Sequence, residues 1–378
     1  MKKKLSKLQE TQKQLELTLQ RTNEKIEHLG RHTSALYEAL TQLQDCFDEI
    51  RNTPAEEKIQ YEKLKEIRQN WKQQADKIET DYRNAEKLDA GAAAAGIGLG
   101  VAVAAMGPTA AMGIATTFGV ASTGTAISAL SGAAATNAAL AWLGGGALAL
   151  GGGGMAAGQA LLALAGPVGW ALAGISLLGS GLFLIKSRND KKKLEDIFTL
   201  IGKRDIDSYN LAIVELNERI KRIRDETGKI RNAIQNIKTF GTDYSMMSES
   251  QQYYLGSYVN LMGASTQLLI NPILGLLPKY TEADYKEYVL YKINTGDSWP
   301  YYKYKDLVIS LANLLYKIDI DQQDKKLLTG CFKANKFLLE SMNLRKKDID
   351  ESILDVVDSA IYLKNVEENS PAYRKSSS

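Results

Sequence analysis

Apolar residues recur at steps of three, four or seven in two widely separated parts of the chain. Near the N-terminus these positions are Leu8, Leu15, Leu19, Ile26, Leu29, Leu36, Leu40, Leu43, Phe47 and Ile50. Further along they are Ile206, Tyr209, Ile213, Leu216, Ile220, Ile223, Ile230, Ile234 and Ile237. This spacing is typical of coiled-coil helices. It predicts two long helices whose apolar faces pair with each other.

The first long helix is expected to stop at Asn52-Thr53-Pro54, because proline disfavours helical geometry in the residue before it. Thr53 then caps a second helix, with Pro54 at its first position. Along that helix one apolar stripe is formed by Leu64, Ile67, Trp71, Ala75, Ile78, Tyr82 and Ala85. The short break predicts that the two helices are antiparallel.

The second helix leads directly into a charge-free segment, Ala90–Ile185. This segment has 96 residues without Lys, Arg, His, Asp or Glu, and it carries 22 of the 31 glycines. A bilayer is crossed by about 20 apolar residues. The segment is therefore long enough for several short membrane spans, or for the interior of an unusually apolar helical bundle.

The apolar character of this segment is graded. Residues 161–185 contain twelve Leu, Ile, Val or Phe residues, worth about −4 to −7 kcal/mol on an insertion scale. Residues 107–138 contain five, worth about −2 to −3 kcal/mol. We therefore expect one robust span near its end and marginal segments before it. The expected membrane-inserting residues are Leu161, Leu164, Val168, Trp170, Leu172, Ile175, Leu177, Leu178, Leu182, Phe183 and Ile185.

Small residues dominate the marginal part. The pairs Gly96/Gly100 and Gly154/Gly158 have the four-residue spacing that lets helix backbones approach closely. Such packing fits association between protomers, and it equally fits a tight hairpin within one chain. The spacing leaves both interpretations open.

A basic cluster follows the charge-free segment at once. Its members are Lys186, Arg188, Lys191, Lys192 and Lys193. Such a cluster suits a helix end close to a membrane surface, and a solvated helix face is the alternative. Residues 186–240 have 14 basic and 9 acidic residues, whereas residues 1–89 have 17 of each. No part of the chain is basic enough to predict a nucleic-acid interface.

Residues 245–378 show less regular apolar stripes and are expected to form further helices. Twelve of the 18 tyrosines lie between Tyr244 and Tyr316. An interfacial aromatic belt would explain them, but packing in a helical core is the favoured explanation. The polar residues from Glu367 onward predict a disordered tail.

These patterns predict an all-α fold, an elongated coiled-coil bundle with a Gly/Ala-rich hydrophobic helical hairpin inserted into it. Four parts are expected. Residues 1–89 form a coiled-coil helical hairpin, 90–185 the membrane-inserting region, 186–244 a coiled-coil helix returning along the N-terminal arm, and 245–378 a C-terminal helical domain.

The sequence offers little catalytic or metal-binding chemistry. Gly96-Ile97-Gly98-Leu99-Gly100 follows a helix and lacks the Lys-Ser/Thr of a phosphate-binding loop. His28 and His32 lie one helical turn apart, which favours a solvated helix face over a metal site. Cys46 and Cys331 give neither a disulfide framework nor metal spacing. We therefore expect no enzyme activity, no cofactor and no bound metal.

The strings at residues 121–127, 130–146 and 151–156 look like a glycine-rich hydrophobic module of uncharacterised bacterial coiled-coil proteins. The wider layout resembles the α-helical pore-forming toxins of the cytolysin A and tripartite haemolysin type. That resemblance is architectural and carries over no individual residue. It implies a form that hides the hairpin, a rearrangement that exposes it, and oligomeric insertion into lipid.

The expected function is membrane permeabilisation by a toxin or a bacterial defence effector. Its expected partners are a lipid bilayer, further copies of the chain and a possible protein trigger, with no nucleic acid. Polar Gln9 and Glu10 after Met1–Lys4 predict no cleavable signal peptide, so a cytoplasmic form, a cell-membrane form or both are expected. The alternatives are a permanently anchored coiled-coil scaffold that recruits a partner, and a protein that uses the segment simply as its core.

Replacing Leu178 with Arg separates these classes. A charge at the centre of a span costs about 2.5–3.5 kcal/mol, so Leu178→Arg should abolish dye release from anionic liposomes while the helical content is kept. Undiminished release by the variant would contradict a span at this position.

Overall fold

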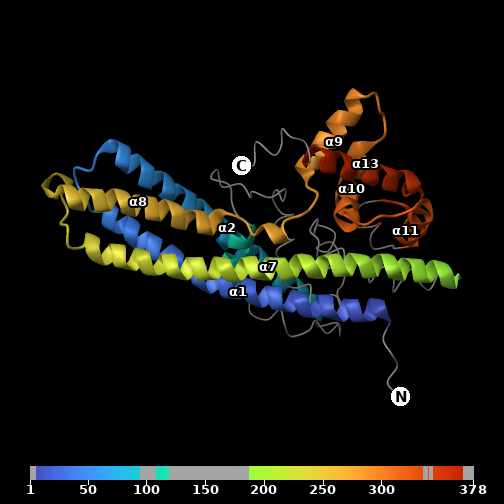
Figure 1. The fold of residues 1–378 in the computed structure, drawn as a ribbon, viewed down its shortest axis with the longest axis horizontal. Coiled ribbons are helices and arrows are strands. Elements are labelled where there is room, and N and C mark those ends of the chain that lie inside the picture. The colour runs from blue at the N-terminus through green and yellow to red at the C-terminus, as the bar shows by residue number, and fades with distance from the viewer. Residues whose placement is uncertain (1–5, 94–107, 119–186, 335–338, 340–343, 369–378) are drawn as a thin grey trace, which may run out of the picture.

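The computed structural model describes residues 6–93, 108–118, 187–334, 339 and 344–368. Within these ranges the fold is all-α, with nine α-helices and no β-strand (Figure 1). Their bounds are α1 Lys7–Asp48, α2 Ala55–Ala93, α3 Pro108–Phe118, α7 Arg188–Ile237, α8 Glu249–Ile270, α9 Glu282–Asn294, α10 Tyr301–Leu315, α11 Gln322–Ala334 and α13 Glu351–Glu368. Three short 3-10 helices lie at Tyr244–Met246, Leu274–Leu276 and Lys346–Asp348.

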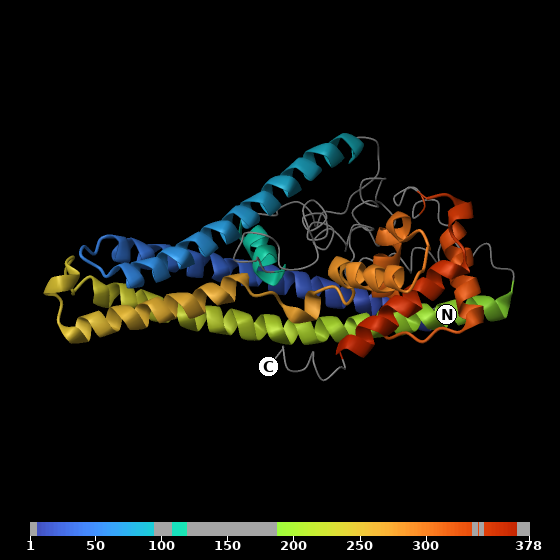
Figure 2. The same ribbon diagram turned by 90° about the horizontal axis from the view of Figure 1, so that it is seen from above.

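The axis of the molecule is the pair α1 and α7, with 42 and 50 residues. The two helices run side by side in the same direction (Figures 1 and 2). At their ends the backbone of Arg51 bonds to Thr242 and Tyr244, with N···O distances of 2.9 and 3.0 Å. The expected pairing of the two heptad helices is confirmed. Nine of the ten apolar seam positions from Leu8 to Ile50, the last of them just after α1, are buried, and the side chain of the tenth, Leu19, is not among the described ones.

Local chemistry sets the ends of α1. Ser6 and Gln9 form a reciprocal capping box at its start, with bonds of 3.0 and 3.3 Å. At its other end Asn52 adopts a left-handed φ of 61°. Thr53 was expected to cap α2, but its hydroxyl donates to the Ile50 carbonyl instead. The carbonyl of Pro54 accepts the first hydrogen bond of α2, from the amide of Lys58 at 3.0 Å.

Helix α2 runs back antiparallel to α1, as the short break predicted. The ring of Phe47 lies 5.2 Å from that of Tyr61, and the ring of Tyr37 lies 5.6 Å from that of Trp71. Helix α8 packs against both α2 and α7, so four helices form one end of the molecule (Figure 2). Beyond this end α2 diverges from α1.

A buried arginine joins three of these helices. Arg68 of α2 donates to Gln44 of α1 at 2.7 Å and to Thr266 of α8 at 3.4 Å. The Gln44 amide in turn donates to Asp48 at 2.9 Å. Burial lowers the pKa of Arg68 to about 10, which still leaves the guanidinium charged at neutral pH. Because a buried charge is costly unless it is hydrogen-bonded, this network fixes how α2 packs on its neighbours.

Helices α9, α10, α11 and α13 form a C-terminal helical unit at the other end of α7 (Figure 1). Tyr280, just before α9, and Tyr285, Tyr288, Tyr301 and Tyr304 within this unit are buried, whereas Tyr291 and Tyr302 are exposed. Core packing therefore accounts for most of the tyrosine cluster. Helix α13 continues to Glu368, one residue beyond the start of the expected tail, and residues 369–378 lie outside the described part.

A half-buried arginine of α7, paired with its buried neighbour Asp205, joins α7 to the C-terminal unit. Arg204 of α7 donates to the carbonyls of Leu314 and Tyr316 at 2.9 and 2.6 Å, and to the Asp205 carboxylate at 2.8 and 2.9 Å. The Asp205 side chain is 1% exposed. Burial raises its pKa to about 6, although the charges of Arg204 and Lys279 favour the ionised form.

The raised pKa of Asp205 makes a pH-dependent prediction. The folded protein keeps this proton up to about pH 6, whereas the unfolded chain releases it near 3.8, so ionisation removes stability as the pH rises through this window. Asp205→Asn keeps an acceptor for Arg204 without the buried charge. It should raise the free energy of unfolding by about 1–2 kcal/mol more at pH 7.5 than at pH 5.

Thermal unfolding of both proteins at the two pH values measures this difference. An equal effect of Asp205→Asn at pH 5 and pH 7.5 would contradict the raised pKa.

Candidate functional site: the buried helix of the charge-free segment

Helix α3 is the described helix that lies wholly inside the charge-free segment. It is enclosed by α1, α2 and α8 (Figure 2). Ala111, Met112, Ile114, Ala115, Thr116 and Thr117 are all buried, none of them more than 7% exposed. The helix starts at Pro108, whose fixed φ and missing amide proton suit a first helical position. A piece of the segment expected to enter lipid is thus held in the interior of the helical bundle.

Helices α1 and α3 meet backbone to backbone. A Cβ added at Gly30 of α1 would lie 1.7 Å from the carbonyl oxygen of Thr109. A Cβ added at Gly113 of α3 would lie 2.1 Å from the carbonyl oxygen of Ile26. Only glycine fits at either position, because each lacks the atom that would collide. The two glycines therefore define the crossing point of α1 and α3.

Buried hydroxyl groups surround this crossing. Thr33 donates to the Leu29 carbonyl at 2.5 Å, and Thr117 donates to the Gly113 carbonyl at 2.7 Å. Thr22 of α1 bonds in the same way to the Thr18 carbonyl. Each hydroxyl is satisfied within its own helix, so separating α3 from α1 would break none of these three bonds. Thr116 has a fully buried hydroxyl with no hydrogen-bond partner among the described residues.

Most of the residues predicted to act in the membrane lie outside the described part of the chain. These are Leu161, Leu164, Val168, Trp170, Leu172, Ile175, Leu177, Leu178, Leu182, Phe183, Ile185, the glycines Gly96, Gly100, Gly154 and Gly158, and Lys186. Their roles stay predictions.

The rest of the basic cluster lies at the start of α7. Arg188, Lys191 and Lys192 are exposed. Lys193 instead pairs with Asp321 and Asp324 at the start of α11, at 2.8 and 3.0 Å. Its charge is therefore used within the chain to hold the C-terminal unit, a role that sequence spacing alone did not reveal.

Sequence reasoning did not single out Gly30 or Gly113. Gly30 did carry a signal, because glycine within a helix costs about 1 kcal/mol relative to alanine. A glycine between Leu29 and Arg31 in a regular heptad helix therefore indicates that another segment packs closely at this position. The close approach of α3 supplies that reason.

The histidines and cysteines of the described residues do not gather into a site. His28 is exposed and His32 is half-buried on α1, with ring centroids 4.8 Å apart, and partial burial lowers both pKa values. No group of three or more potential metal ligands occurs among the residues that the structure places. Burial raises the pKa of the Cys331 thiol to about 11, which makes it a poor nucleophile.

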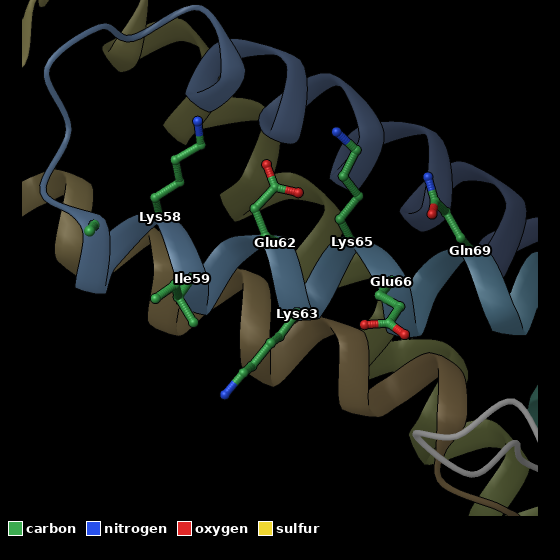
Figure 3. Close-up of a pocket in the computed structure, with 8 residues that line it drawn as sticks. Lys58, Ile59, Glu62, Lys63, Lys65, Glu66 and Gln69 are labelled. Carbon is green, nitrogen blue, oxygen red and sulfur yellow. The ribbon is translucent and has the colours of Figure 1, made fainter.

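An open hollow lies along the first part of α2. Figure 3 shows Lys58, Glu62, Lys65 and Gln69 on one side of the helix, and Ile59, Lys63 and Glu66 on the other. Lys65 is engaged by Asp48 at 2.8 Å. The lining contains side chains of both charges but no histidine, cysteine, serine or threonine, so it does not concentrate the chemistry of a catalytic site.

No protein-family model, curated protein or solved structure matches this chain. The resemblance to α-helical pore-forming toxins therefore remains an expectation. In the described ranges, no helix has both the length and the apolar composition needed to cross a membrane.

The glycine crossing makes a direct prediction. Gly30→Ala puts a methyl group into the α3 backbone and should lower the free energy of unfolding by about 1–3 kcal/mol, as overpacking does. In Gly228→Ala on α7 the added Cβ meets nothing within 4 Å, so this control should gain about 0.5–1 kcal/mol from helix propensity.

Denaturant unfolding measures both changes. A Gly30→Ala protein as stable as Gly228→Ala would show that α1 and α3 do not cross at this distance.

Proposed function

We propose that this protein is a membrane-permeabilising helical effector that keeps part of its hydrophobic segment buried until it is triggered. The observation that carries the proposal is the burial of α3, a charge-free helix, between two long helices with charged outer faces. A permanently inserted anchor has no need for such an enclosure. A protein that alternates between a closed and an inserted form does need it.

The packing of α3 suits a reversible enclosure. Among its described side chains only Met112 and Ile114 are large and apolar, and burying each contributes about 1.5–3 kcal/mol. The total of about 3–6 kcal/mol is comparable to the ~5.5 kcal/mol that turns a two-state equilibrium from 1:99 to 99:1. A modest trigger could therefore release α3. The seam of α1, with nine buried residues, would survive such a step.

In this proposal the bilayer is the target, and the small residues of the charge-free segment let several copies of the chain pack together. The exposed Arg188, Lys191 and Lys192 at the start of α7 favour an anionic surface. These residues directly follow the segment predicted to insert. The proposal therefore places the first lipid contact at this end of α7.

Loosening the glycine crossing tests the proposal. Gly30→Ala should release more dye from anionic liposomes than the wild type, by about tenfold if the lost stability falls on the closed form. The double variant Gly30→Ala/Leu178→Arg should return release to background, because the exposed segment could no longer span.

Leu255→Ala on α8 is the matched control, because it removes a buried side chain remote from the glycine crossing and should destabilise the fold without freeing α3. Equal release by Leu255→Ala and Gly30→Ala would contradict a specific enclosure. Protein that partitions into membranes without release in every variant would support the anchored scaffold instead.

A further inference from the structure

The connection between α8 and α9, residues 271–280, forms a strap that runs along α7 (Figure 1). Pro272 and Pro278 lie in it and cannot donate backbone hydrogen bonds. Ile273, Leu276 and Tyr280 are nonetheless buried, at 0%, 4% and 0% exposure. A connection with such buried anchors is a packed element of the fold and not a loose linker.

Two charged side chains of α7 hold the first half of the strap. Arg219 donates to the carbonyls of Leu268 and Asn271 at 3.0 and 2.7 Å. One turn earlier the Glu215 carboxylate accepts from the amides of Leu274 and Gly275 at 3.0 and 3.1 Å. Hydrogen bonds to charged groups are stronger than neutral ones, so this half of the strap is firmly fixed to α7.

Gly275 allows the strap to touch the helix backbone. A Cβ added there would lie 3.0 Å from the Cβ, 3.1 Å from the Cα and 3.2 Å from the nitrogen of Ala212 in α7. Because these atoms belong to a long helix, they cannot easily yield. A side chain at position 275 would therefore have to push the strap away from α7 by a few tenths of an ångström.

The second half of the strap is fixed to the C-terminal unit. Asn313 of α10, which is 1% exposed, accepts from the amides of Lys279 and Tyr280 at 2.8 and 3.0 Å. Its amide group donates back to the Tyr280 carbonyl at 2.7 Å. Displacing α10 would consequently pull on the strap.

The strap also reaches α3. The amide of Ile273 donates to the carbonyl of Thr117 at 2.7 Å. Thr117 is in the last turn of α3, where the carbonyls have no partner within their own helix. This bond links the buried charge-free helix to a segment that α7 and the C-terminal unit hold in place.

We propose that the strap is the release element for α3. A partner that displaces the C-terminal unit would lift residues 271–280, break the Ile273–Thr117 bond and free α3 from its enclosure. This inference deepens the proposed function and rests on it for its biological meaning. The mechanical coupling from strap to α3 can be tested without any membrane.

Hydrogen–deuterium exchange of the full chain measures the coupling. Gly275→Ala should increase the exchange rate of the peptide covering residues 108–118 by about tenfold, because local opening sets amide exchange. Gly256→Ala on α8, where the added Cβ meets nothing within 4 Å, is the matched control and should leave this rate unchanged.

A second variant keeps Gly275 and removes the negative charge of Glu215. Glu215→Gln weakens the two accepted bonds and should act in the same direction, whereas Glu218→Gln, an exposed position one turn further on α7, should not. In each variant the peptide covering residues 36–48 of α1 should exchange as in the wild type, which separates release of α3 from general unfolding.

The outcomes distinguish the two proposals. Unchanged exchange of residues 108–118 in both Gly275→Ala and Glu215→Gln, or an equal rise in residues 36–48, would overturn the strap as release element. Faster exchange of α3 supports it. If that faster exchange brings no added dye release from anionic liposomes, the strap stands and the proposed membrane function fails.

Discussion

The close crossing of α1 and α3 depends on one steric constraint. Two helices can bring their backbones together only where both lack a Cβ, and Gly30 and Gly113 provide such a point. A methyl group at either would collide with a carbonyl oxygen of the other helix. This contact places a charge-free helix inside a bundle whose outer surface is highly charged. The divergence of α2 from α1 and the course of residues 271–280 both accommodate that enclosed helix.

Buried charges join the layers around this centre. Arg68 connects α2 to α1 and α8 through Gln44 and Thr266, and Arg204 with Asp205 connects α7 to the C-terminal unit. Buried ionic groups contribute little net stability. In this protein they set the places where helical layers meet. The apolar seam of α1 and α7 supplies the stability of the axis itself.

The contacts that hold α3 are weaker than those that hold α1 against α7. Around α3 the contacts are mostly small residues and hydroxyls, with two large apolar side chains, Met112 and Ile114, and one backbone bond from Ile273. Between α1 and α7 they are large aliphatic side chains along the full seam. A trigger that acts on the weak contacts would leave the axis intact. That difference is the physical basis for a helix that can be released without unfolding the whole molecule.

Much of the fold follows from the sequence alone. Heptad spacing determined α1 and α7 and their pairing, because burying an apolar stripe is the dominant gain for an amphipathic helix. The proline break determined the antiparallel α2. The tertiary structure decided what spacing cannot encode. Gly30 and Gly113 meet although they are 83 positions apart in the sequence. Lys193 pairs with Asp321 and Asp324 from another part of the chain, and Ile273 bonds to Thr117. Each of these contacts depends on distances between segments remote in the chain, which local pattern does not contain.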